Sequence, residues 1–282
     1  MMGVQMFGGN AGPVFPRWGF FTDMTAIALV NTKDGIVVAA DGLSRWGDDS
    51  TRDDLVRQHE RLNEKKVFKA ECGAWDIAWA LTGLVLNKDR SFSLITEVKR
   101  SFRVANEGSR DSLSHWLEVF SNSLRDCVSR ARSTKVLGPF AENEIHPPGS
   151  DERFTFARIL MAGYFYAGKP AISIVRISHK NGVLADPQKL ICSPPEHDIF
   201  TGSDEIRKRY FDEHEDRRFK KYFRPTGPTL PEGLAHAKGY IEACSDPLAS
   251  EVDPLCKGIG GHIHAAAVTR SGFVWLIPPL NL

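Results

Sequence analysis

The chain has 282 residues, of which 42% are hydrophobic, enough to bury one large core or two small ones. Its 36 Lys and Arg residues nearly balance its 35 Asp and Glu residues, so a formal net charge of +1 creates no overall field that favours nucleic acid or an anionic membrane. Five cysteines without a C-x-x-C pair indicate neither a disulfide framework nor a zinc ribbon, and no run of roughly 18 apolar residues predicts a membrane span.

The N-terminal region differs from the rest of the chain. Residues 1–23 are rich in Gly, Pro and aromatic residues without a period, which predicts a tail or propeptide. They do not resemble a signal peptide, so an intracellular, cytoplasmic protein is expected. Residues 24–282 are expected to form one domain, with charged insertions near residues 43–64, 135–153 and 207–230.

Two apolar runs rich in β-branched residues open this domain, TAIALVNT at 25–32 and GIVVAAD at 35–41. The Lys-Asp-Gly between them favours a tight turn, so the two runs are predicted to form an antiparallel hairpin. KVFKAECGAWDIAWALTG, at 66–83, predicts a second hairpin that turns at Gly73.

A long amphipathic helix is predicted within residues 109–132, with Ser109 or Ser112 available as its N-cap. Its apolar positions recur at helical spacing and are Leu113, Trp116, Leu117, Phe120, Leu124 and Cys127. After a loop, FTFARILMAGYF at 154–165 and KPAISIVRIS at 169–178 predict two further strands.

The C-terminal part is predicted to contain helices from about Asp204 and over 231–243, where Pro231 suits a first helical turn. The chain closes with GGHIHAAAVTRSGFVWLIPP, a hairpin that turns at Arg270-Ser271-Gly272. Helices grouped apart from mostly antiparallel strands predict an α+β fold of two packed sheets with helices outside.

Common catalytic and nucleotide-binding motifs are missing: the sequence lacks G-x-x-x-x-G-K-[ST], G-x-G-x-x-G, H-E-x-x-H and G-x-S-x-G. His262 and His264 lie two apart on a predicted strand and could share one face, but no third ligand accompanies them, so no metal and no cofactor are expected. The run at 207–224 mixes basic and aromatic residues with acids that would repel phosphate. A solvated helical insertion or a protein contact is expected there, rather than a nucleic-acid site.

The stretch MTAIALVNTKDGIVVAADG, at 24–42, resembles the start of proteasome β subunits and of the bacterial peptidase HslV. In that family a mature N-terminal Thr precedes two short strands, an Asp follows them and a Lys stands in the next strand. Thr25, Asp41 and Lys66 match these positions.

Three later segments extend the resemblance as far as about residue 279. ALTGL at 80–84 is similar to the region of the family's oxyanion-hole glycine, which places that role on Gly83. FTGSDEIRKRY at 200–210 is similar to a Gly-Ser strand-to-helix junction, which places the family's assisting serine at Ser203. The closing hairpin is also similar.

The resemblance implies a four-layer αββα sandwich of the N-terminal nucleophile (Ntn) hydrolases, with two antiparallel sheets between helical layers. It further implies threonine peptidase activity on peptides or unfolded proteins, a homo-oligomeric ring and an ATPase unfoldase partner. Two alternatives stay open: a non-catalytic structural subunit of the same fold, and an Ntn amidohydrolase that acts on a small amide.

The residue types suit this chemistry. A Thr hydroxyl needs a base, and the α-amino group of a first-residue Thr can serve as one, with an unperturbed pKa of roughly 7.7 to 8.0. A neighbouring Lys66 would favour the neutral amine, and Asp41 would hold the lysine. The N–H of Gly83 would face the oxyanion.

Each residue also has a purely structural interpretation. Thr25 is a common residue type at a strand start, Asp41 could bind N–H groups of the following loop, and Lys66 could be a charge at a strand edge. Gly83 could serve a turn, and Ser203 could be a helix N-cap. Their joint order and spacing favours the catalytic interpretation.

Two departures from the family pattern concern spacing. The interval from Asp41 to Lys66 is longer than in compact family members, so it contains an insertion. Asp246, Ser250 and Asp253 all lie near the place where the family has an Asp and a Ser, and Asp253 is our choice.

The residue before Thr25 is a third departure. Self-processing subunits carry Gly there, whereas this chain has Met24. If translation starts at Met24, ordinary methionine removal would expose Thr25. If residues 1–24 stay attached, the amine is blocked and the structural alternative follows.

Overall fold

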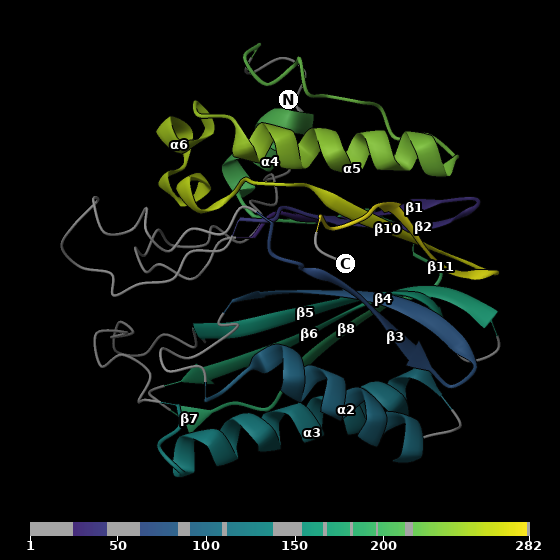
Figure 1. Ribbon diagram of the computed structural model, residues 1–282, viewed down its shortest axis with the longest axis vertical. Helices are drawn as coiled ribbons and strands as arrows, with labels where there is room; N and C mark the ends of the chain where they lie inside the picture. The colour runs from purple at the N-terminus through teal and green to yellow at the C-terminus, as the bar shows by residue number, and fades with distance from the viewer. Residues whose placement is uncertain are drawn as a thin grey trace, which may run out of the picture.

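A computed structural model describes residues 25–43, 63–83, 91–108, 112–137, 154–165, 168–180, 183–195, 197–211 and 217–280. The predicted tail at 1–23 and most of the expected insertions at 43–64 and 135–153 lie outside these residues. The elements stack in four layers, with two sheets between two layers of helices (Figure 1).

The first sheet has the strand order β11-β10-β2-β1-β9, and its neighbouring strands are antiparallel. Its strands are β1 (Ile27–Thr32), β2 (Gly35–Ala40), β9 (Ile199–Thr201), β10 (His264–Thr269) and β11 (Gly272–Ile277). The first and last predicted hairpins are confirmed as β1–β2 and β10–β11. They lie side by side through β2 and β10, so the two ends of the domain share one sheet.

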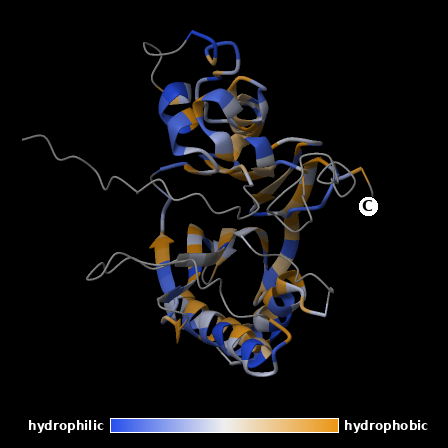
Figure 2. Cartoon of the chain, turned by 90° about the vertical axis from the view of Figure 1, so that its left-hand side faces the viewer, coloured by the Kyte–Doolittle hydropathy of each residue, from blue (hydrophilic) through white to orange (hydrophobic). Residues whose placement is uncertain are grey.

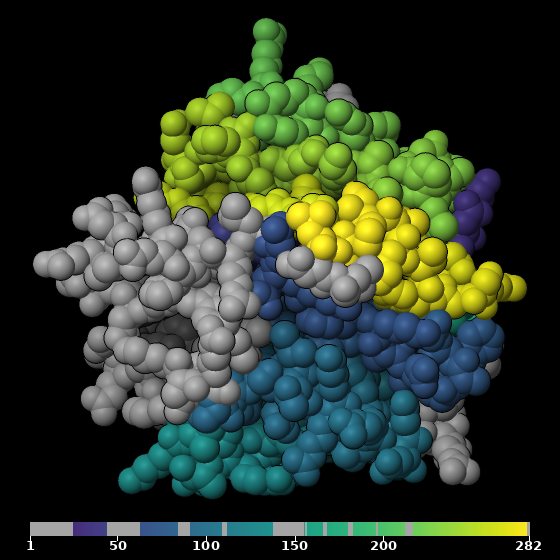
Figure 3. All heavy atoms as spheres, viewed as in Figure 1, coloured from purple at the N-terminus to yellow at the C-terminus, as the bar shows by residue number. Residues whose placement is uncertain are grey.

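The second sheet has the order β3-β4-β5-β6-β7, with β8 also paired to β6. Its strands are β3 (Val67–Cys72), β4 (Trp75–Gly83), β5 (Phe154–Phe165), β6 (Lys169–Lys180), β7 (Val183–Leu184) and β8 (Gln188–Cys192). The predicted hairpin that turns at Gly73 is confirmed as β3–β4. The C-terminal hairpin lies against this hairpin on the surface (Figure 3).

Helices α2 (Leu94–Gly108) and α3 (Leu113–Ser133) cover the second sheet, while α4 (Asp204–Phe211), α5 (Leu230–Ser245), α6 (Ala249–Val252) and the 3-10 helix η3 (Pro254–Gly258) lie over the first (Figure 1). Ser112 caps α3 by accepting a hydrogen bond from the N–H of His115 at 3.2 Å, and Ser109 lies outside the described residues. None of the described helices is long and apolar enough to cross a membrane.

The central strands β1, β2 and β10 are buried almost throughout, which explains why they are apolar runs without alternation. In β1, Ile27 and Leu29 pack between the sheets, while Ala28 and Val30 pack under α4 and α5. Hydrophobic colouring predominates along many of the strands, whereas the helices alternate between hydrophilic and hydrophobic residues (Figure 2). The predicted α+β fold of two antiparallel sheets between helical layers is confirmed.

Two segments differ from the sequence-based description. Helix α2 was not among the predicted elements, although its buried residues Leu94, Val98, Phe102 and Ala105 follow helical spacing between charged residues. The described part of 207–230 is helical only as far as Phe211 and again from α5, and residues 217–229 are exposed or half-buried apart from Phe219. Tyr210 and Phe219 are each 1% exposed and pack beneath α5.

Replacement of Phe120 by Ala tests the helical side of the core. Phe120 is fully buried on α3 and its ring lies 4.8 Å from that of Phe102. We expect Phe120→Ala to lower the free energy of unfolding by about 3 to 5 kcal/mol, measured by urea denaturation. Phe211, which is 40% exposed, is the matched control, and Phe211→Ala should cost clearly less. Equal losses would contradict the assigned core.

Candidate active site

Thr25, Asp41 and Lys66 lie at the ends of neighbouring strands. Thr25 precedes β1 and Asp41 directly follows β2, and the pairing of these strands brings the two residues together. Lys66 directly precedes β3, so it comes from the opposite sheet. The group therefore spans the space between the sheets.

Hydrogen bonds join the three side chains directly. The Nζ of Lys66 donates to the Oγ1 of Thr25 at 3.1 Å and to the two carboxylate oxygens of Asp41 at 3.2 and 3.3 Å. The residues are only 4%, 0% and 9% exposed in the order Thr25, Asp41, Lys66. In this dry setting the lysine charge acts on the threonine oxygen with little screening by water.

Three backbone N–H groups also bind the carboxylate of Asp41. They belong to Ala26 at 2.9 Å and to Leu43 and Gly260, both at 3.2 Å. Burial raises the pKa of Asp41, and the Lys66 ammonium and the N–H groups of Gly260 and Ala26 oppose that rise. Asp41 thus binds the following loop, as its structural interpretation predicts, and also holds Lys66.

Ser203 and Asp253 form a second group. The hydroxyl of Ser203 donates to Asp253 at 2.6 Å and accepts the N–H of Ile206 at 3.0 Å at the start of α4. Asp253 also accepts the N–H of Leu255 at 3.1 Å, which caps η3. The helix-cap interpretation of Ser203 therefore holds together with the contact to Asp253.

The two other candidates near the last strand lie elsewhere. Asp246 accepts hydrogen bonds from Tyr222 at 2.5 Å and from Lys221 at 3.0 Å. The hydroxyl of Ser250 donates to the carbonyl of Pro247. Of the three residues considered from sequence, Asp253 is the one that the structure brings to Ser203.

Thr201 and Tyr240 link the two groups, and the sequence analysis missed both. The Thr201 hydroxyl donates to the carbonyl of Thr25 at 3.4 Å and accepts the N–H of Ile27 at 3.2 Å. The Tyr240 hydroxyl donates to the carbonyls of Thr201 at 3.1 Å and Ser203 at 3.4 Å. The sequence offered one signal for these two residues, which is that Thr201 directly precedes the Gly-Ser pair at 202–203.

Gly83 is the last residue of β4 and pairs with Ala157 of β5. It is buried, and its backbone φ of +106° is a conformation that side chains disfavour. Gly83 belongs to neither hydrogen-bonded group, so its proposed role depends on a bound substrate.

His262 and His264 were predicted to lie on one strand, but β10 begins at His264, so His262 precedes the strand. The Nε2 of His264 accepts the N–H groups of Lys66 at 2.8 Å and Val67 at 3.1 Å, whereas the ring of His262 contacts the carbonyl of Pro278. His264 begins β10 in the first sheet, so it fixes the backbone of Lys66 across the gap between the sheets. Among the described residues, no three or more His, Cys, Asp and Glu side chains form a group that could hold a metal.

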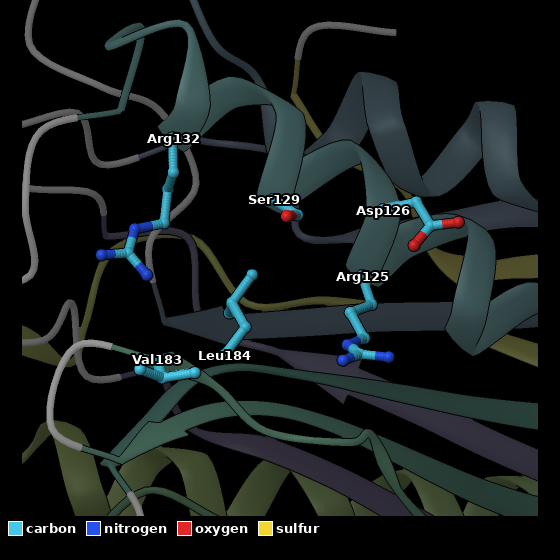
Figure 4. Close-up of a pocket in the computed structure, with 6 residues that line it drawn as sticks. All are labelled: Arg125, Asp126, Ser129, Arg132, Val183 and Leu184. Carbon is cyan, nitrogen blue, oxygen red and sulfur yellow. The ribbon is translucent and has the colours of Figure 1, made fainter.

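A hollow of about 430 Å³ lies between α3 and β7, far from these groups in the fold. It is lined by Arg125, Asp126, Ser129, Arg132, Val183 and Leu184 (Figure 4). Arg125 forms an ion pair with Asp186 at 3.2 Å. None of these residues contributes to the candidate active site.

Comparison with known proteins identifies the fold. No protein-family model and no curated protein matches the chain. Among solved structures, it is similar to a Gly-1 mutant of Anbu from Hyphomicrobium sp. strain MC1, with a TM-score of 0.52 and 14% identity over 89% of this chain and 85% of that chain. This likeness shows the fold alone: the chain has the four-layer αββα sandwich of the Ntn hydrolases.

Removal of the lysine charge tests the buried ion pair. We expect Lys66→Met to lower the free energy of unfolding by about 3 kcal/mol or more, because the buried carboxylate of Asp41 loses its counter-charge. Addition of Asp41→Asn removes the unpaired charge, so the double variant should be more stable than Lys66→Met alone. Urea denaturation of the single and double variants gives the coupling energy, and strict additivity would refute the contact.

The loss of folding stability at acid pH should depend on His264. Burial lowers its pKa from 6.5 to about 4, and the charge of Lys66 adds to that shift. The unfolded chain therefore binds this proton before the folded protein does, and the associated stability is present above pH 6.5 and lost as the pH falls towards 4. The contribution amounts to about 3 kcal/mol.

We therefore expect the free energy of unfolding to fall less between pH 7 and pH 4.5, roughly the range of this titration, in His264→Asn than in the wild type. His115, which is exposed on α3, is the control, and His115→Asn should keep the wild-type slope. Identical slopes for all three proteins would contradict a buried neutral His264.

Proposed function

We propose that the chain is a threonine-type endopeptidase of the proteasome and HslV type, with Thr25 as the nucleophile once residues 1–24 are absent or removed. The observation that carries this proposal is the 3.1 Å hydrogen bond from Lys66 to the Thr25 hydroxyl, backed by Asp41 at 3.2 Å. A lysine held by a buried carboxylate and aimed at a threonine oxygen suits activation of that oxygen.

In this mechanism the freed α-amine of Thr25 accepts the proton of its own hydroxyl while Oγ1 attacks the peptide carbonyl. The N–H of Gly83 stabilises the oxyanion of the tetrahedral intermediate. The protonated amine then gives its proton to the leaving amine, and an ester to Thr25 remains. A water molecule, deprotonated by the same amine, hydrolyses the ester and restores the threonine.

The surrounding charges suit an amine that works as a base. An α-amino group has an unperturbed pKa of roughly 7.7 to 8.0, and the fixed positive charge of Lys66 disfavours a second cation beside it. In this proposal Ser203 and Asp253 help to position Thr25. Thr201 and Tyr240 connect them to the backbone of Thr25.

Assembly belongs to the same proposal. We infer a homo-oligomeric ring that encloses the sites, peptides or unfolded proteins as substrates, and an ATPase unfoldase that delivers them. The domain would comprise residues 24–282, and 1–23 would be a tail or propeptide. The resemblance of 24–42 to proteasome β subunits and the shared fold support this organisation.

A non-catalytic subunit of the same fold is the second candidate. It is favoured by the burial of Thr25, which is only 4% exposed and follows Met24 in the chain. An amidohydrolase that acts on a small amide would use the same nucleophile but would not need a ring.

The intact mass of the protein from its own host decides whether the nucleophile is free. We expect a mass that begins at Thr25, because an acylated nitrogen cannot act as the base. Retention of Met24 in every preparation would overturn the mechanism and favour the non-catalytic subunit.

Substitution of the nucleophile is the second test. We expect Thr25→Ala to lower peptide hydrolysis by at least about 1,000-fold and Thr25→Ser to retain measurable activity, since only the serine keeps a hydroxyl. Size-exclusion chromatography of both variants controls for assembly. Turnover of small amides but not of peptides would favour the amidohydrolase.

A further inference from the structure

Two arginines lie side by side on the inner face of the second sheet. Residues of β4, β5 and β6 that face the first sheet form cross-strand rows, of which Ala78–Ala162–Ile172 and Ala80–Leu160–Ile174 are apolar and buried. The next row along the same face is Thr82–Arg158–Arg176. The apolar part of this inner face therefore ends at a pair of guanidinium groups.

This pair is unfavourable without a partner. Arg158 and Arg176 are directly opposite on antiparallel strands, where like charges repel, and both are partly buried. Burial lowers the pKa of Arg158 and the charge of Arg176 lowers it further. No carboxylate within the described ranges forms an ion pair with either side chain, and the nearby Asp204 is already paired with Arg207 at 3.1 Å.

The pair lies at the same end of the sandwich as the candidate active site. Thr82 of the arginine row is followed by Gly83, the proposed oxyanion donor, and Ala157, the partner of Gly83, precedes Arg158. On the opposite side, the charge of Asp204 acts on Arg158, and Asp204 follows Ser203. The arginines thus lie beside elements that the proposed reaction uses.

We propose that Arg158 and Arg176 bind a carboxylate of the substrate, so that the protein prefers peptides with an acidic group near the cleaved bond. This inference rests on the proposed function of the Thr25 site. An arginine fork matches a carboxylate with two parallel hydrogen bonds, and a bound anion also relieves the repulsion between the two cations. The carboxylate can belong to a Glu or Asp side chain or to a free peptide C-terminus.

Binding to the Thr25→Ala variant tests the proposal without hydrolysis. Three peptides of one sequence are compared by calorimetry: an amidated peptide with Glu, its amidated Gln counterpart, and the Gln peptide with a free C-terminal acid. We expect at least one acidic peptide to bind roughly tenfold or more tightly than the neutral one, the gain of a charge-assisted pair. The stronger of the two acidic peptides identifies the source of the carboxylate.

Arginine variants show where the acid binds. In the same background, Arg158→Gln and Arg176→Gln should each remove most of the preference. Arg158→Lys, which keeps the charge but loses the fork, should remove part of it and also controls for folding. Arg103, exposed on α2, is the matched control, and Arg103→Gln should leave the preference unchanged.

The outcomes separate this inference from the proposed function. If the wild-type protein hydrolyses peptides without any preference for acidic ones, this inference is overturned while the proposed peptidase activity is supported. An acid preference that survives both Arg→Gln variants would also overturn it. If acidic peptides bind through the arginines but the wild-type protein does not hydrolyse them, the result supports the carboxylate site and refutes the proposed peptidase activity.

Discussion

The ion pair between Lys66 and Asp41 crosses the gap between the two sheets, and the candidate active site depends on it. A buried charge is costly unless it is paired and hydrogen-bonded, and each partner here finds its counter-charge on the other side of the gap. Asp41 also has three N–H donors around it, so its position is fixed without the second sheet. Lys66 has no such cage for its ammonium, and its orientation follows from Asp41 and Thr25. Any shift of one sheet relative to the other would therefore act first on the lysine.

Two contacts limit such a shift. His264 accepts the backbone N–H groups of Lys66 and Val67 with one ring nitrogen, which requires a neutral imidazole with its proton on Nδ1. Gly260 donates to Asp41 and accepts the N–H groups of Gly42 and Leu43, so the segment after η3 holds the end of β2. Both residues come from the C-terminal part of the chain. The segment from Gly260 to His264 thus positions Asp41 and Lys66, which come from the first two hairpins.

Local pattern was enough to predict most of the strands, because buried strands leave continuous apolar runs and tight turns leave Gly signals. Thr25, Asp41 and Lys66 could be named because their order and spacing match the family that the sequence resembles, since each residue alone has an ordinary structural interpretation. The support from Tyr240, Gly260 and His264 could not be predicted, since it arises from contacts between segments up to 219 residues apart. The same limit applied to Asp253, which local pattern could not separate from Asp246. Helix α2 is different, because its apolar spacing was present in the sequence and was overlooked among charged neighbours.

The charges near the site differ from the charge of the whole chain. A formal net charge of +1 argues against any general preference for anions. Around Thr25, however, Asp41 balances Lys66, which leaves the positive charges of Arg158 and Arg176 uncompensated by a paired carboxylate among the described residues. A partly desolvated charge acts over a short range with weak screening, so two such residues can determine ligand choice where the overall composition cannot. Ligand selectivity would then arise from the cross-strand row that contains Arg158 and Arg176. Substitutions in that row could change selectivity while the proposed nucleophile Thr25 is retained.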